Sequence, residues 1–302
     1  MLMRKILLTL ALGFSLTSLA QVFNVGQIVK LDTPVDRAAK VVAISPQADY
    51  ILLSDEQNVG LTKFDLATQQ TQRITDAKGA GYKVLISPDG QDIVYRETTF
   101  NERHLRYNAL KSTSLATGST LELVAPTRDL QGYDIQNATA AAVDNGHMKL
   151  TAIHGNAAAS ARPVLSIKNR QLMITRNGQT EVFSPKGTEF SYIWESISPD
   201  GTKALFYVCG VGAFVCNIDG SNLVGLGEIR APKWYDDNTI VGMYDQDNGY
   251  YVTSSVIKAA TLDGAVQTLT DGSIIALEPV GANGAIVFST PVGETYLINV
   301  TK

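Results

Sequence analysis

Short apolar runs alternate with turn residues along most of the chain, and three stretches share one pattern. Each has an apolar run, a Ser-Pro turn and a second apolar run, over residues 41–53, 83–95 and 195–207. Two of these turns read Ser-Pro-Asp-Gly, in which proline fixes φ at the first central position and glycine accepts a positive φ. The pattern predicts a repeated strand–turn–strand unit.

Weaker copies of the unit follow at 233–241 and 279–288, where turn-forming residues are kept although the residue types differ. A second pair of short apolar runs follows each copy, for example 61–66 and 71–75. The unit is therefore expected to contain four antiparallel strands. Capped amphipathic runs of helical length are almost absent between the strands, which argues against a βαβ fold.

The spacing of the turn prolines sets the expected number of units. Pro46 and Pro88 lie 42 residues apart, whereas Pro88 and Pro199 lie 111 apart, so a hidden copy is expected between residues 131 and 185. Asn177-Gly178 is a strong hairpin signal within that stretch. This count predicts six units of about 47 residues, within the range of propeller blades.

The two ends of the chain predict how the ring closes. The sixth unit ends at residues 295–300 and lacks a final strand, while residues 27–31 offer an unpaired one. Closure by this strand would leave few exposed strand edges. The sequence thus predicts an all-β protein, a single six-bladed β-propeller over 21–302 with four antiparallel strands per blade, closed by the N-terminal strand.

The first 20 residues resemble an export signal. Arg4-Lys5 precede the apolar stretch 6–16, and small residues follow at Ser18 and Ala20. As a helix, about 11 apolar residues span only about 16 Å, too little for a membrane anchor. We expect cleavage after Ala20, no transmembrane segment in the mature chain, and a periplasmic or secreted protein.

Composition narrows the class of partner. Hydrophobic residues make up 45% of the chain and charged residues 18%, which excludes a disordered protein. The net charge is −4, and it becomes more negative once Arg4 and Lys5 are removed. A nucleic-acid partner is therefore not expected, because no basic stripe is available for phosphate contacts.

Cys209 and Cys216 flank a glycine-containing centre that reads as a hairpin turn. Export would expose them to an oxidising compartment. Two alternatives follow, a cross-strand disulfide or two free thiols, since the closed loop would be short and its entropic gain small. A zinc site is disfavoured because no histidine lies nearby to complete four ligands.

The Ser-Pro-Asp-Gly units after a signal peptide resemble the TolB-type, WD-repeat-like β-propellers of bacterial envelopes. The resemblance covers most of 39–300 and is strongest at 83–95 and 195–207. It implies a binding or scaffolding platform, although similar propellers also occur beside serine peptidases and in some polysaccharide lyases. The extra N-terminal domain of TolB is missing here, so the resemblance implies no role in the Tol system.

Catalytic and metal-binding motifs are not expected. The chain has no Gly-x-Ser-x-Gly elbow. Its three histidines, His104, His147 and His154, fall in predicted loops or degenerate strands. Residues 245–249 resemble the start of a calcium loop, but the later acidic ligands are absent, and Asn248-Gly249 is better explained as a hairpin turn. We therefore predict no cofactor and no metal.

Propeller geometry predicts a binding surface at one end of the channel. The loops that enter the innermost strands and the hairpins that follow the second strands share a face. The residues predicted on it are Lys83, Trp194, Glu195 and Arg230 from the loops, and Arg96, Glu97, Tyr244, Asp245, Asp247 and Tyr250 from the hairpins. Trp194 has two interpretations, an exposed anchor or a residue packed between blades, whereas Trp234 is expected to pack between blades.

These observations predict a monomeric, exported, non-enzymatic binding or scaffold protein whose partner is a protein or a glycan. The alternative is a carbohydrate-active enzyme similar to the propeller lyases. Three or more histidine or carboxylate side chains converging in the channel would favour that alternative.

Overall fold

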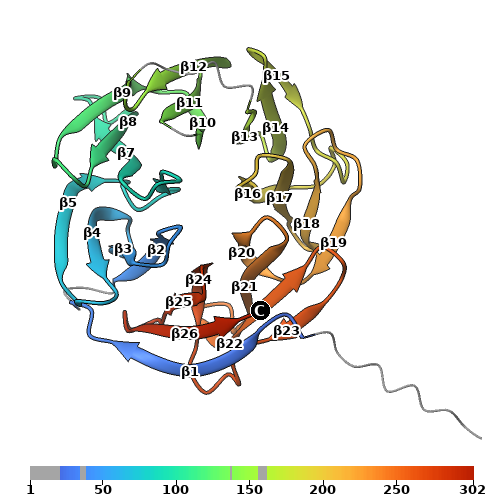
Figure 1. The fold of residues 1–302 in the computed structure, drawn as a ribbon. Coiled ribbons are helices and arrows are strands. Elements are labelled where there is room, and N and C mark those ends of the chain that lie inside the picture. Colours follow the sequence, from blue (N-terminus) through green and yellow to red (C-terminus); the bar gives the residue numbers. More distant parts are fainter. Residues whose placement is uncertain (1–20, 35–38, 137, 156–161) are drawn as a thin grey trace, which may run out of the picture.

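A computed structural model describes residues 21–34, 39–136, 138–155 and 162–302. The predicted signal, residues 1–20, lies outside the described residues. The described part of the chain is all-β, forms seven antiparallel sheets and contains no helix. The sheets stand around a central channel as the blades of a propeller (Figure 1). Among the described residues no helix is long and apolar enough to cross a membrane.

We number the blades in chain order. Blades 1 and 2 consist of β2 (Lys40–Ile44), β3 (Tyr50–Ser54), β4 (Val59–Asp65), β5 (Thr71–Lys78), β6 (Leu85–Ile86), β7 (Asp92–Phe100), β8 (Arg106–Ser114) and β9 (Thr120–Thr127). Blades 3 and 4 consist of β10 (Leu130–Gln136), β11 (Thr139–Asp144), β12 (His147–Ala152), β13 (Val164–Lys168), β14 (Gln171–Arg176) and β15 (Gln179–Val182). Blades 5 and 6 consist of β16 (Tyr192–Ile197), β17 (Lys203–Val208), β18 (Gly212–Asn217), β19 (Val224–Gly227), β20 (Arg230–Asp236), β21 (Thr239–Asp247), β22 (Val252–Thr261) and β23 (Val266–Thr268). Blade 7 consists of β24 (Leu277–Ala282), β25 (Ala285–Ser289), β26 (Thr295–Thr301) and β1 (Asn24–Leu31).

The prediction that the N-terminal strand closes the ring is confirmed. β1 pairs antiparallel with β26, from Asn24 opposite Thr301 to Leu31 opposite Thr295. It forms the outer strand of blade 7, so the first and last segments of the chain complete one sheet. This pairing also covers the outer edge of β26, which would otherwise be open.

The expected number of six blades is wrong, because the structure has seven in its described part. Residues 131–185 were expected to hold one four-stranded blade, but residues 130–182 form two blades with three described strands each. β12 belongs to blade 3, and β13 opens blade 4. The four-strand expectation therefore holds for five of the seven blades.

Because blades 3 and 4 have three described strands each, the innermost strand of blade 4 runs opposite to those of the other blades, and the usual direction returns in blade 5. We call the end of the propeller that carries the Ser-Pro turns the turn face, and the opposite end the hairpin face. Arg162, just before β13, donates hydrogen bonds to the carbonyls of Ser198 and Pro199 at the turn face. Lys168, the last residue of β13, lines a cavity at the hairpin face. β13 thus runs opposite to the other innermost strands. Its turn to β14 lies on the hairpin face, which explains why no Ser-Pro-Asp-Gly signal marks blade 4.

The Ser-Pro turns explain why the repeat unit can be recognised in the sequence of the blades that carry them. In the turn at Pro88, the Ser87 hydroxyl accepts a hydrogen bond from the backbone N–H of Asp92 at 2.9 Å and donates to the Asp89 carboxylate at 2.5 Å. The Ser87 hydrogen bond is the main cause of a lowered pKa of Asp89. The turn at Pro199 repeats the serine contact with Lys203 N–H at 2.9 Å. Each residue type is therefore required by the local backbone.

The core consists of layers between blades. The described residues contain seven buried apolar clusters, one at each interface between neighbouring blades. The cluster between blades 3 and 4 is the smallest, with Ala141, Val143 and Val164 as its buried members. Blade 7 packs on both sides, through Phe288 toward blade 6 and Val287 toward blade 1.

The expected cross-strand pairing of the cysteines is not present. Cys216 lies opposite Ala204 in the β17–β18 pair, whereas Cys209 lies in the turn between these strands. Both cysteines are free thiols, and Cys216 is buried whereas Cys209 is exposed. The turn is centred closer to Cys209 than the sequence suggested, since Val208 pairs with Gly212.

This arrangement predicts unequal thiol reactivity. Burial raises the pKa of Cys216 to about 12, so the thiolate that reacts with electrophiles is scarce at neutral pH. We expect an aromatic disulfide reagent to label Cys209 in the native protein and Cys216 only after denaturation. Cys209→Ser should abolish native labelling. Titration of neither thiol in denaturant would instead show that the two had formed a disulfide.

Candidate functional site

Backbone strain recurs where the innermost strands begin on the hairpin face. Lys83, Trp194, Ala231 and Glu278 have φ values of 51°, 55°, 46° and 46° although none is glycine. The pairing register also shifts in β16, β20 and β24 beside these residues, as in β-bulges. Such residues are uncommon in this region, and bulges re-aim side chains. All four line one cavity, which points to a functional site.

This mouth cavity has a volume of about 750 Å³ and opens at the hairpin face. That size is typical of ligand pockets. All seven blades contribute to its wall, from Lys40 in blade 1 to Glu278 in blade 7. A ligand held here would therefore contact every repeat of the ring.

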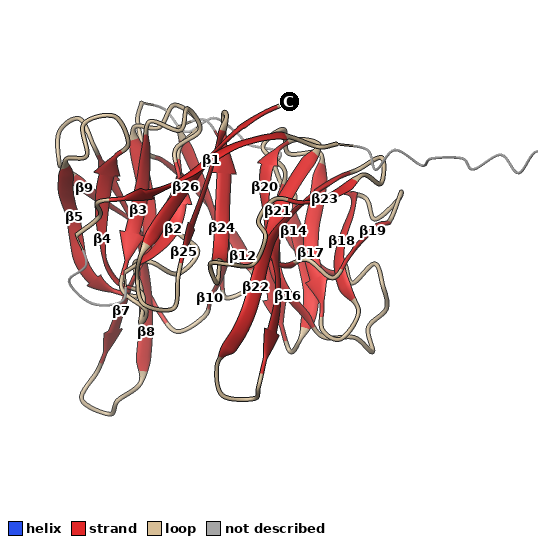
Figure 2. Cartoon of the chain, turned by 90° about the horizontal axis from the view of Figure 1, so that it is seen from below, coloured by secondary structure: helices blue, strands red, loops and turns tan. Residues whose placement is uncertain are grey.

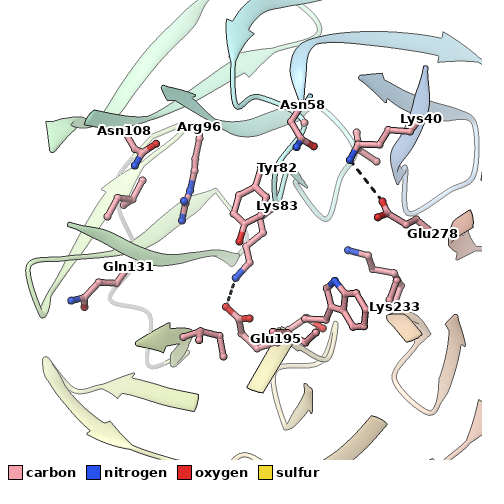
Figure 3. A pocket seen from close by; sticks show the side chains of 18 of the residues that line it. Lys40, Asn58, Tyr82, Lys83, Arg96, Asn108, Gln131, Glu195, Lys233 and Glu278 are labelled. Atoms are coloured by element: carbon pink, nitrogen blue, oxygen red, sulfur yellow. Dashed lines mark hydrogen bonds and ion pairs between the residues drawn. The ribbon is translucent and has the colours of Figure 1, made fainter. Parts of the chain in front are cut away.

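Two ion pairs cross the mouth cavity (Figure 3). Lys83 of blade 2 pairs with Glu195 of blade 5, whose side chain is only 3% exposed. Lys40 of blade 1 lies 3.9 Å from Glu278 of blade 7. Each of these two glutamates therefore already has a lysine partner.

Lys233 extends from β20 into the same space, and its ammonium has no hydrogen bond or ion pair with any described residue. Lys233 is exposed to water at the mouth, although the surrounding protein still desolvates its ammonium. Burial lowers the pKa of Lys233, and the ammonium groups of Lys83 and Lys40 lower it further. Glu278 and Glu195 oppose this shift without cancelling it.

The lowered pKa of Lys233 predicts a pH-dependent stability. The unfolded chain keeps this proton up to its ordinary pKa of 10.5, whereas the folded protein releases it at lower pH. Between these values the unfolded state binds more protons, so stability rises with pH. Lys233→Met should therefore melt at a slightly higher temperature at neutral pH, because water screens an exposed ammonium, and the difference should shrink toward about pH 10. Lys149→Met, an exposed lysine of β12, is the matched control. Equal melting temperatures of the Lys233→Met and wild-type proteins at neutral pH would contradict the prediction.

A second cation, Arg96, lies between two aromatic rings. Its guanidinium carbon is 5.2 Å from the centre of the Tyr82 ring and 5.3 Å from that of Tyr133. Its Nε is buried without a hydrogen-bond partner, and no described carboxylate pairs with it. Burial raises the pKa of Tyr133 to about 12, which keeps the phenol neutral beside the arginine.

Tyr133 also holds the loop that contains Tyr82 and the positive-φ residue Lys83. Its hydroxyl lies 2.8 Å from the carbonyl of Lys83 and 3.1 Å from that of Tyr82, so it donates a hydrogen bond shared between them. Blade 3 thereby holds the positive-φ residue of blade 2 in place. The arrangement positions both Lys83 and Tyr82 before any ligand arrives.

Basic side chains dominate the wall of the mouth cavity. Among described residues, seven basic side chains face three acidic ones. The basic residues are Lys40, Lys83, Arg96, Arg106, Arg128, Lys168 and Lys233, and the acidic ones are Asp129, Glu195 and Glu278. The chain as a whole carries a net charge of −4. Positive charge is therefore concentrated at this cavity.

The structure brings together four of the predicted site residues and separates the others. Lys83, Arg96, Trp194 and Glu195 line the mouth cavity. The other predicted residues lie outside its wall, and several of them contact neighbouring side chains. Arg230 pairs with Asp245 at 3.0 Å, and Glu97 pairs with Lys111 at 2.5 Å. The Tyr244 ring lies 4.1 Å from the Lys258 ammonium, Asp247 accepts a hydrogen bond from Gly249 N–H at 2.9 Å, and Tyr250 is 93% exposed at a hairpin tip.

Trp194 combines both interpretations from the sequence. It lines the mouth cavity and also packs against the cluster between blades 5 and 6, with its ring 5.2 Å from that of Tyr207. Trp234 packs against the same cluster from the turn-face side, as expected.

Sequence reasoning missed Lys40, Tyr82, Tyr133, Lys233 and Glu278. One signal was available for Glu278. Lys83 and Trp194 each lie five residues before their turn prolines, and the same offset from Asn283, in the turn of blade 7, gives Glu278. No spacing in the sequence points to Tyr133, because its role is a hydrogen bond to the backbone of blade 2.

No group of three or more His, Cys, Asp or Glu side chains is placed to hold a metal ion within the described ranges. The three carboxylates of the mouth cavity do not converge, since Glu195 and Glu278 face different lysines.

Comparisons with known proteins agree with the fold. No family model and no curated protein sequence matches the chain. A putative TolB from Agrobacterium tumefaciens is 14% identical with a TM-score of 0.53, and the match covers 88% of this chain and 91% of that one. TolB from Acinetobacter baumannii is 17% identical with a TM-score of 0.50, over 79% of this chain but only 55% of that one. An oligogalacturonate lyase from Vibrio parahaemolyticus is 15% identical with a TM-score of 0.47, over 86% and 76% of the two chains. At these identities the similarity to the TolB propellers extends to the fold alone.

Proposed function

We propose that the protein is an exported, non-enzymatic binding protein that holds a protein partner at the mouth cavity of its propeller. The observation that carries the proposal is the convergence of four strained, non-glycine residues on one cavity. Strain of this kind costs about 1–3 kcal/mol per residue and persists where the fold over-determines it, commonly at ligand sites. The signal-like sequence at residues 1–20 supports export to the periplasm or beyond.

Site-specific photo-crosslinking in the cells that produce the protein tests this function. A photoreactive side chain at Tyr82, which is 47% exposed at the mouth cavity, should yield a discrete adduct with a partner. The same group at Gln91, an exposed residue of the Pro88 turn on the opposite face, is the matched control. Adducts of equal yield at both positions, or none at Tyr82, would contradict the proposal.

The enzymatic alternative requires a separate assay. The purified protein should release no unsaturated sugar from a panel of polysaccharides with added divalent metals. Release that is lost when Lys83 or Glu195 is substituted would replace the binding function with a lyase-like one.

A further inference from the structure

Of the seven basic side chains that line the mouth cavity, only Lys40 and Lys83 form an ion pair with a described residue, so Arg96 and Lys233 are among those without a counter-charge. The guanidinium of Arg96 is held by the rings of Tyr82 and Tyr133, and no described carboxylate pairs with it. The ammonium of Lys233 points into the cavity, while both nearby glutamates pair with other lysines. The buried Nε of Arg96 has no hydrogen-bond partner, which is costly for a charged group, whereas the ammonium of Lys233 is exposed at the mouth and open to a ligand. A ligand that brings the missing anions would offset that cost.

The geometry of Arg96 favours a carboxylate. A planar guanidinium matches two carboxylate oxygens, and stacking between rings limits the orientations that must be lost on binding. Lys233 offers a compact second charge from another blade. The excess of basic over acidic side chains around them would attract an anionic chain and repel a cationic one.

Exposed aromatic side chains on the same face favour a polypeptide. The β7–β8 and β21–β22 hairpins extend beyond the rest of the hairpin face (Figure 2). Phe100 at the end of β7 is 55% exposed, and Tyr250 and Tyr251 between β21 and β22 are 93% and 68% exposed. Exposed aromatic residues are enriched at protein–protein interfaces. Two such tips flanking a basic cavity suit a folded partner that inserts an acidic segment.

We propose that the mouth cavity binds an acidic segment of a protein partner, with one carboxylate on Arg96 and a second on Lys233. This proposal rests on the proposed function and adds the chemistry of the partner. The hairpin tips contact the body of that partner.

Fluorescence anisotropy with a defined probe tests the charge requirement. The probe is a labelled peptide of alternating Glu and Gly, and its uncharged match alternates Gln and Gly. We expect the Glu peptide alone to bind, with an affinity that falls as salt rises. Arg96→Gln and Lys233→Gln should each weaken binding by roughly tenfold or more. Lys149→Gln, which removes the same charge from β12, should leave binding unchanged.

Arg96→Lys separates charge from shape. This variant keeps the positive charge but loses the planar fork, so the Glu peptide should bind more weakly than to the wild type. Tyr250→Ser should leave peptide binding unchanged but reduce partner crosslinking at Tyr82, because the tip contacts only a folded partner.

The outcomes distinguish this proposal from the proposed function. Equal binding of the Gln peptide, or unchanged binding by both the Arg96→Gln and Lys233→Gln variants, would overturn the acidic segment even if crosslinking at Tyr82 succeeds. Displacement of the Glu peptide by a carboxylated polysaccharide at lower concentration than by the unlabelled peptide would assign the site to a glycan. Binding as expected, without any crosslinked partner in cells, would leave the chemistry intact and remove the function.

Discussion

Deletion of residues 21–32 is expected to unfold the whole propeller and not only to fray one end. Val22, Phe23 and Leu31 are buried in the clusters on both sides of blade 7, at exposures of 7%, 1% and 7%. The side-chain oxygen of Gln267 in blade 6 accepts hydrogen bonds from the N–H groups of Val22 and Phe23, both at 2.8 Å. Losing several buried side chains at about 1.5–3 kcal/mol each would remove most of a typical stability of about 5–15 kcal/mol. Circular dichroism should show no cooperative melting transition.

Point variants within the segment give a graded test. Phe23→Ala should cost about 3–5 kcal/mol, as for other buried phenylalanines. Val29→Ala, in β1 and 42% exposed, should cost no more than about 0.5 kcal/mol. A truncated protein that melts like the full-length chain would show that β1 does not close the ring.

The sequence predicted the fold wherever the local backbone dictates residue type. The Ser-Pro turns at Pro46, Pro88 and Pro199 mark three blades because serine, proline and the following residues each satisfy a backbone requirement there. Blade 4 lacks that mark because β13 runs in the reverse direction and its turn to β14 lies on the hairpin face. The count of six followed from treating residues 131–185 as one regular unit, whereas residues 130–182 form two blades.

The sequence predicted only part of the candidate site, because only some of its residues follow from local backbone requirements. Lys83 and Trp194 could be found because they lie at a fixed offset from their turns. The strict alternation of a strand assigns each side chain to one face, but a bulge with positive φ changes that assignment. Lys233 lies two residues after the positive-φ residue Ala231, and it was predicted only as the first residue of the repeat copy 233–241. Contacts such as Lys83 with Glu195, 112 residues apart, depend on closure of the ring.

Trp194→Ala is expected to lower the free energy of unfolding by about 2 kcal/mol, less than the roughly 3–5 kcal/mol of a fully buried aromatic residue. The ring packs against Tyr207 and the cluster between blades 5 and 6, but one side of it faces the mouth cavity. Chemical denaturation monitored by circular dichroism measures the loss. A partner-binding defect in this variant would combine lost contact with lost stability, so Tyr82→Ala is the cleaner binding variant. Tyr82 is 47% exposed, but its ring also contacts the Arg96 guanidinium, so its loss should cost about 0.5–1 kcal/mol.

Trp194→Gly separates the packing of the ring from the strain of the backbone. The φ of 55° at Trp194 is unfavourable for any residue with a Cβ atom, whereas glycine adopts it freely. Both variants lose the indole, so Trp194→Gly should be more stable than Trp194→Ala by about 1 kcal/mol. At Ile197 in the same strand, where φ is not positive, glycine should be less stable than alanine. If Trp194→Gly is instead the less stable of the two variants, the bulge is not strained, and the recurrence of positive φ at the mouth cavity loses its value as a sign of function.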